Sequence, residues 1–170
     1  DRMKVFIGGA WLYGNSSAHV GHLAALLPGD VIARYYRKKG VEVIFVSGTD
    51  CHGTPITLRA RKENVTAESI ADKYHNEFKE NFEKLDFSYD MYNKTMDPFH
   101  KEEVRKYFLE IMNNGYIYEK FEDQDYCLKC DKFLSDREIE GVCPHCGGLA
   151  KGDQCDSCLM ELSAKEILEK

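Results

Sequence analysis

The sequence lacks a long hydrophobic run. None of its apolar stretches approaches the roughly 20 residues that a transmembrane helix needs, so we expect no membrane-spanning segment and no membrane partner. The opening residues Asp1-Arg2-Met3 have the pattern of neither a signal peptide nor a transit peptide. Because the cysteines are also spaced for metal binding rather than for disulfides, we predict a cytoplasmic protein.

An excess of basic residues is also missing. Lys and Arg number 23 against 29 Asp and Glu, which gives a formal net charge of −6. This balance argues against a protein that binds nucleic acid through bulk positive charge, although it leaves room for a local RNA contact. The 43% hydrophobic and 31% charged content is ordinary for a globular protein.

The first part of the chain alternates strand and helix patterns. Residues 4–9 and the run 41–46 are apolar and predict two buried strands, and the helical segment 20–38 between them is expected to be interrupted at Pro28-Gly29. Strand, helix and strand within about forty residues form a βαβ unit, which makes the strands parallel. The predicted fold class is therefore α/β, a Rossmann-like parallel sheet with a small zinc-knuckle domain.

Three further helices are expected. Thr54 is the predicted N-cap of one, with Pro55 at its first position, and Thr66 begins a long helix that ends near Leu85. Asp97-Pro98 begins a fourth, ending near residue 114. The apolar residues expected to face inward are Ile70, Tyr74, Phe78, Phe82 and Leu85 in the long helix, and Val104, Tyr107, Phe108, Ile111 and Met112 in the fourth.

The composition changes near residue 115. Short strands are expected around 116–118 and 124–126, after which Gly, Cys and Asp dominate and apolar periodicity fades. We therefore predict a Rossmann-like nucleotide-binding half-domain over residues 1–115 and a zinc-knuckle domain over 116–170.

Six of the seven cysteines form three Cys-x-x-Cys pairs. Each pair predicts a zinc knuckle, and two pairs complete a tetrahedral Zn²⁺ site with four thiolates. The candidate ligands are Cys127, Cys130, Cys143, Cys146, Cys155 and Cys158. Six thiolates exceed the four that one ion needs, so either one pair is idle or its partner lies outside this chain. The spacing leaves open which pairs share an ion.

Two histidines, His19 and His22, lie where the first strand leads into the first helix. Open α/β sheets bind nucleotides at such a corner, with helix N–H groups turned toward phosphate. Imidazole N–H donors can stabilise charge on a transferring phosphoryl group, and Gly21 lets a nucleotide approach the backbone. The chain has no GxGxxG motif and no P-loop, so the common competing nucleotide signatures are absent.

These residues carry a family resemblance. His19-Val20-Gly21-His22 resembles the HIGH signature of class I aminoacyl-tRNA synthetases, and residues 30–37 resemble the helix that follows it. Residues 49–55, Thr-Asp-Cys-His-Gly-Thr-Pro, resemble a stretch typical of the methionyl-tRNA synthetases. The cysteine knuckles around residues 133–144 look like the zinc-bearing connective peptide of the same enzymes. The resemblance covers essentially the whole chain.

The resemblance implies an ATP-dependent ligase that activates methionine to methionyl-adenylate and transfers it to tRNA(Met). ATP with Mg²⁺ would be a substrate, and Zn²⁺ a structural ion. His19 and His22 would be catalytic and, with Gly21, would bind ATP. The implied methionine-binding residues are Leu12, Tyr13 and Asp50, the last holding the substrate ammonium group.

The second family signature, KMSKS, is absent from the sequence. We therefore expect the first half of a catalytic domain that is not active alone. Two alternatives remain open. A small nucleotidyltransferase shares the His-x-Gly-His corner but has no cysteine-knuckle insertion. A zinc-ribbon module would bind RNA or protein through residues 116–170.

Overall fold

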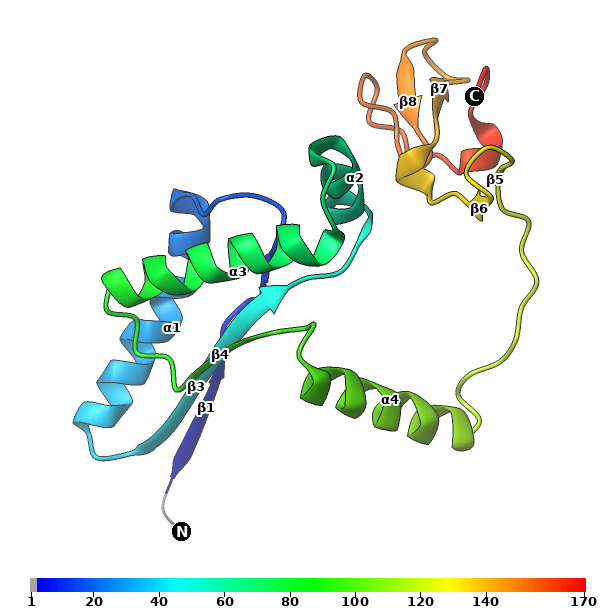
Figure 1. Cartoon of the computed structure of the whole chain (residues 1–170). Helices are drawn as coiled ribbons and strands as arrows, with labels where there is room; N and C mark the ends of the chain where they lie inside the picture. The colour runs from blue at the N-terminus through cyan, green and yellow to red at the C-terminus, as the bar shows by residue number, and fades with distance from the viewer. Residues whose placement is uncertain (1–2) are drawn as a thin grey trace. The chain divides into compact units, whose positions relative to one another are not determined.

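The structure is a computed structural model that describes residues 3–170. The chain forms two compact units, Asp1–Tyr116 and Ile117–Lys170 (Figure 1). Among the described residues, no helix is long and apolar enough to cross a membrane.

The first unit contains a parallel sheet built around its central strand. The strands are β1 (Lys4–Gly8), β2 (Leu12–Tyr13), β3 (Glu42–Asp50) and β4 (Met91–Lys94). β3 pairs in parallel with each of the others, from Lys4 opposite Glu42 to Tyr13 opposite Asp50. The predicted α/β fold with a parallel sheet is confirmed.

Four helices accompany this sheet, and three of them share its core. They are α1 (Val20–Lys38), α2 (Thr54–Glu63), α3 (Ala67–Lys84) and α4 (Pro98–Asn113). Leu26 of α1, Ile56 of α2 and Phe78 of α3 belong to one buried cluster. Along the first half of β3, buried Val43 and Phe45 alternate with the exposed Glu42 and Ile44, so this half is covered on one face only, whereas Ser47, Gly48 and Thr49 are buried in succession.

Helix α1 is continuous, so the predicted interruption at Pro28-Gly29 is wrong. Pro28 has no backbone N–H to donate within the helix, but the packing of α1 on β3 compensates for this lost hydrogen bond. Gly29 lies so close to β3 that a Cβ atom there would stand 3.0 Å from the Phe45 ring. The close contact with β3 therefore favours a continuous helix through a sequence that would tend to interrupt it alone.

The helix starts were predicted with mixed success. Thr66 caps α3 through a bond from the Ser69 N–H at 3.1 Å, as expected. The N-cap of α2, however, is Gly53 rather than Thr54. Gly53 has a φ of 130°, a backbone conformation that residues with a Cβ atom rarely adopt. A Cβ atom there would also collide with the Tyr13 hydroxyl group.

Not every apolar helix face is buried. Four of the predicted positions in α3 are in the core, but Leu85 lies beyond the last turn and is exposed. In α4 all five residues expected to face inward are at least 42% exposed. Periodicity identifies an apolar face but not its partner, and within the described part of the chain no residue of α4 is buried.

The second unit consists of two short hairpins. β5 (Tyr126–Cys127) pairs with β6 (Lys132–Phe133), and β7 (Glu140–Val142) pairs with β8 (Leu149–Lys151), both antiparallel. Two 3₁₀ turns, Asp136–Glu138 and Ala164–Glu166, follow β6 and β8. The predicted strand at 116–118 is absent, and the one expected at 124–126 forms later, as β5. The small core consists of Cys143, Ala150, Cys155, Leu162 and Ile167.

Candidate functional site

The two histidines form the N-terminal cap of α1. His19 is the N-cap residue, and its Nδ1 accepts the Gly21 N–H at 3.1 Å. The Nδ1 atom of His22 accepts the His19 N–H at 3.2 Å. The imidazole rings stack with centroids 3.9 Å apart. The sequence forms a capping box here with histidines in the positions that Ser and Glu usually occupy.

This capping fixes which ring nitrogens can meet a ligand. Because Nδ1 of each ring is an acceptor, the proton of each neutral imidazole lies on Nε2. Burial, followed by the charge of His19, lowers the pKa of His22, which favours the neutral ring near pH 7. The corner therefore offers two neighbouring Nε2–H donors at a helix N-terminus, a combination suited to phosphate oxygens.

Gly21 serves this arrangement in a way that the sequence did not show. A Cβ atom at Gly21 would lie 2.9 Å from Cε1 and 3.0 Å from Nδ1 of His19. The missing side chain therefore makes room for the His19 ring. Its predicted role in the approach of a nucleotide remains a prediction.

The predicted methionine-binding residues lie together at the carboxyl end of the sheet. Leu12 and Tyr13 form β2 and pair with Thr49 and Asp50. The Gly14 N–H donates to the Asp50 carbonyl at 2.7 Å. The Asp50 carboxylate accepts the His52 N–H at 3.3 Å. Leu12 is buried, whereas Tyr13 and Asp50 are half-buried, so both polar side chains retain access to a ligand.

The loop between β2 and α1 is held by the helices beside it. The Arg59 guanidinium of α2 donates to the Asn15 carbonyl at 2.5 Å and lies over the Tyr74 ring at 4.9 Å. The Ser17 hydroxyl donates to Glu77 of α3 at 3.2 Å. These contacts fix the path of the chain into the histidine corner.

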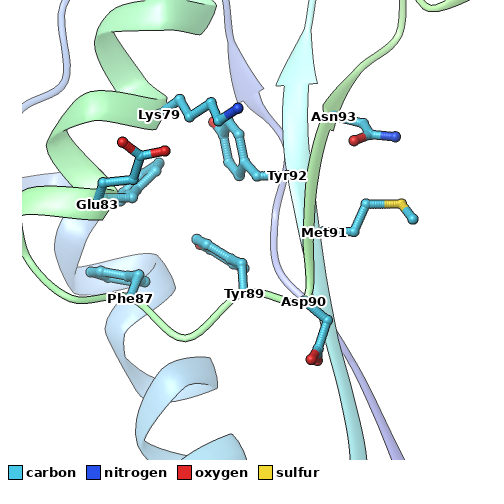
Figure 2. A pocket seen from close by; sticks show the side chains of 9 residues that line it. Lys79, Glu83, Phe87, Tyr89, Asp90, Met91, Tyr92 and Asn93 are labelled. Atoms are coloured by element: carbon cyan, nitrogen blue, oxygen red, sulfur yellow. The ribbon is translucent and has the colours of Figure 1, made fainter.

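Two cavities lie along α3. One of about 390 Å³ has a mainly apolar lining that includes His19, Leu23 and Phe82. The other, of about 340 Å³, lies between α3 and the segment leading into β4 (Figure 2). Its lining includes Lys79, Tyr89 and Tyr92, and none of the residues predicted to bind ATP or methionine. The corner and the second cavity are therefore separate features.

Sequence reasoning missed a buried polar group behind Asp50. Thr49 bonds His75 of α3 and Tyr92 of β4, and none of the three was singled out. One signal was present, because His75 directly follows Tyr74 on the apolar face of a helix. The neighbouring Cys51 is buried, and this burial raises the pKa of its thiol, which agrees with a structural rather than nucleophilic residue.

In the second unit, four cysteines converge. The Sγ atoms of Cys143, Cys146, Cys155 and Cys158 all lie within 4.8 Å of one another. Two of these separations are 3.9 Å (Cys143 to Cys158) and 3.5 Å (Cys146 to Cys155). Sulfurs about 2.3 Å from a tetrahedral ion would be ~3.8 Å apart, so the donor set fits Zn²⁺. Backbone N–H groups of Cys158 and Ser157 lower the pKa of Cys155 to about 6, which favours a thiolate.

The remaining two predicted ligands, Cys127 and Cys130, are not part of this group. They belong to the β5–β6 hairpin, whereas the four clustered cysteines lie on and after the β7–β8 hairpin. Within residues 3–170 they join no set of three or more metal-binding side chains. The structure thus brings four of the six candidate ligands together, and a metal-binding role for Cys127 and Cys130 remains a prediction. Spacing could not choose between the pairs, because the choice depends on which hairpins pack together.

Known proteins are similar to this chain in sequence and in fold. A family model described as tRNA synthetases class I (M) matches residues 5–170. The chain is 55% identical over 168 residues to the methionine–tRNA ligase of Bacillus mycoides (strain KBAB4), covering 99% of this chain and 31% of that protein. Identity and coverage are the same for the methionine–tRNA ligase of Bacillus cereus (strain G9842).

Solved structures agree. The crystal structure of Mycobacterium tuberculosis methionyl-tRNA synthetase bound by methionyl-adenylate matches with a TM-score of 0.72 and 25% identity. The match covers 88% of this chain and 29% of that one. The chain thus spans about a third of the length of the relatives that it matches.

Proposed function

The chain belongs to the class I tRNA synthetases of the methionine type, and on that premise we propose that it is the part of a methionine–tRNA ligase that binds ATP phosphates and methionine. The observation that carries the proposal is the histidine corner, where Nδ1 of His19 and of His22 each accepts a backbone N–H at the start of α1, which leaves Nε2 of each ring as the donor. The complete protein would convert methionine, ATP and tRNA(Met) into methionyl-tRNA(Met) in the cytoplasm.

In the first step, the methionine carboxylate attacks the α-phosphorus of ATP and pyrophosphate leaves. Negative charge builds on the phosphate oxygens as this bond forms. The Nε2–H donors of His19 and His22 stabilise that charge, and the fixed cap means that they need little reorganisation. Mg²⁺ bound to ATP would neutralise part of the same negative charge. The adenylate is then attacked by the terminal ribose hydroxyl of tRNA.

The methionine site is proposed at the end of β3. The Asp50 carboxylate pairs with the substrate ammonium group, and Tyr13 and Leu12 flank it from β2. Register pairing of Tyr13 with Asp50 supports this assignment, because it puts an aromatic ring beside the charge that orients the substrate. An apolar wall of this kind suits a thioether side chain.

We assign Zn²⁺ to the four clustered cysteines, where it would stabilise the second unit. That unit has a buried core of five residues, two of which are these cysteines themselves. Such a small core gives little folding free energy, so a metal would supply much of it. The ion has a structural role, since all four positions of the tetrahedron are filled by protein.

The test is methionine-dependent exchange of pyrophosphate into ATP by the complete protein. We expect the wild type to catalyse it and His22→Ala to reduce it about a hundredfold, because one preorganised donor is lost from the transition state. His145→Ala is the matched control, as His145 is exposed and belongs to the second unit. Undiminished exchange by His22→Ala would disprove the catalytic role of that histidine. Exchange that depends only on another amino acid would disprove the proposed methionine–tRNA ligase function.

A further inference from the structure

A buried hydrogen-bonded group lies directly behind the proposed methionine site. Thr49 is fully buried, and its Oγ1 lies 2.9 Å from Nδ1 of His75 and 3.2 Å from the hydroxyl of Tyr92. His75 is 9% exposed, and its ring stacks on that of Tyr92 at 5.6 Å. A buried hydroxyl therefore joins the middle of α3 to both β3 and β4.

One arrangement of protons makes both hydrogen bonds of Thr49. With His75 neutral and protonated on Nε2, Tyr92 donates to Thr49, and Thr49 donates to Nδ1. Burial lowers the pKa of His75, which agrees with the neutral ring. The charged groups around it balance in sign, since Lys94 and Lys79 oppose Asp97 and Asp72. The Thr49 hydroxyl is bonded on both sides without a charge in the group, so the contact does not depend on protonation of His75.

Thr49 also contacts the chain segments that lie on either side of β3 next to Asp50. Its carbonyl accepts the Thr95 N–H at 3.1 Å, and it pairs in register with Leu12. Gly14, which bonds the Asp50 carbonyl, packs so closely that a Cβ there would lie 3.1 Å from Cγ2 of Thr49. Because side chains alternate along a strand, Thr49 points toward the helices and Asp50 toward the opposite face. A shift of Thr49 would therefore move Asp50 through the backbone.

From this geometry we propose that His75 is a positioning residue for the amino acid site: acting through Thr49, it holds the carboxyl end of β3 where Asp50 meets the substrate ammonium group. The proposal rests on the function proposed above. His75 touches neither substrate in this scheme. Its effect is on the affinity for methionine, not on the phosphate chemistry at the histidine corner.

The experiment measures steady-state pyrophosphate exchange by the complete protein with methionine and ATP varied separately. In Thr49→Val and His75→Leu, we expect the KM for methionine to rise about three- to tenfold, the effect of one lost hydrogen bond. The KM for ATP and the kcat should stay within about twofold. Because both variants break the same contact, the double variant should resemble the single ones rather than multiply their effects.

Two further variants separate positioning from general stability. His75→Asn carries an amide oxygen able to replace Nδ1 as acceptor, so it should restore most of the methionine KM. Ile70→Ala removes a buried side chain of the same helix that makes no bond to Thr49, so its methionine KM should stay at the wild-type value.

Three results would overturn the proposal. They are an unchanged methionine KM in His75→Leu, an equal rise in Ile70→Ala, or a His75→Asn variant as impaired as His75→Leu. A failure of the proposed function looks different, because the wild type would then show no methionine-dependent exchange, or Asp50→Asn would leave the methionine KM unaltered. Either of those results would remove the basis of the inference as well.

Discussion

The buried carboxylate of Asp30 offers a sharp test of how the first unit is held together. Asp30 is 5% exposed in the middle of α1 and accepts three hydrogen bonds. Two come from Ser88, from its N–H and its hydroxyl, each at 2.6 Å. The third comes from Nε of Arg34 at 2.7 Å. Asp30 therefore ties α1 to the segment that leads into β4.

Replacing Asp30 with Ala removes both carboxylate oxygens and with them all three hydrogen bonds. Each bond from Ser88 to the charged carboxylate is worth about 1.5–3 kcal/mol, and the Ser88 N–H would be left without this partner. The Arg34 side chain is 43% exposed, so water replaces its lost partner and the pair adds at most about 0.5 kcal/mol. We expect Asp30→Ala to lower the free energy of unfolding by about 3–5 kcal/mol, and Asp30→Asn by roughly half of that, since one acceptor remains.

Trp11, the only tryptophan, lies in the first unit and reports its unfolding by fluorescence. In urea, with a slope of about 2 kcal/mol per molar, the midpoint should fall by roughly 1.5–2.5 M. The control is Glu42→Ala, which breaks an exposed pair with Lys4 and should shift stability by less than about 0.5 kcal/mol. A midpoint for Asp30→Ala no lower than that of the control would refute this account.

The same residue has a pH signature. Burial acts to raise the pKa of Asp30, but the bonds from Ser88 and Arg34 outweigh it, so the folded-state pKa is lowered. A carboxyl group with a lowered folded pKa stabilises the fold above its unfolded pKa of about 3.9 and loses that contribution as the pH falls through the folded value. The stability gap between wild type and Asp30→Ala should therefore narrow below about pH 4.

Two other features give direct tests. Cys155→Ser removes one of four clustered thiolates, so metal analysis of the reduced protein should find the bound zinc lost. The control Cys51→Ser should retain it, because Cys51 is not in the cluster. Equal zinc content in both variants would contradict the four-cysteine site. Gly21→Ala would put a Cβ atom 2.9 Å from the His19 ring and displace it, so pyrophosphate exchange should fall at least about tenfold with the methionine KM unchanged, and full activity would disprove the need for that ring position.

Local patterns predicted those features that depend on neighbours in sequence. Apolar runs on either side of a helical segment gave the parallel β1–β3 pair, and Thr66 at the start of a helix with one apolar face gave the cap of α3. The histidine corner was located in this way, between the first strand and the first helix, whereas the role of Asp50 was implied only by the family resemblance.

The features that local patterns predicted wrongly, left open or missed depend on contacts between distant segments. The continuity of α1 through Pro28 is favoured by its close packing on Phe45 of β3, which no local pattern reveals. The choice of four cysteines out of six depends on how two hairpins are arranged. Thr49 and His75 are 26 residues apart, and their hydrogen bond exists only because α3 packs on β3. Propensity within one segment carries no information on such pairings.

The position of β1 has a consequence for how the 170-residue polypeptide behaves in concentrated solution. Within residues 3–170, β3 is the only strand that pairs with β1, so its other edge keeps unsatisfied N–H and C=O groups. Phe6 on β1 is 71% exposed and Ile44 on β3 is 48% exposed. A bare strand edge next to aromatic and aliphatic surface is a template for the same strand of a second molecule. We therefore expect this edge to promote self-association of the 170-residue polypeptide as its concentration rises.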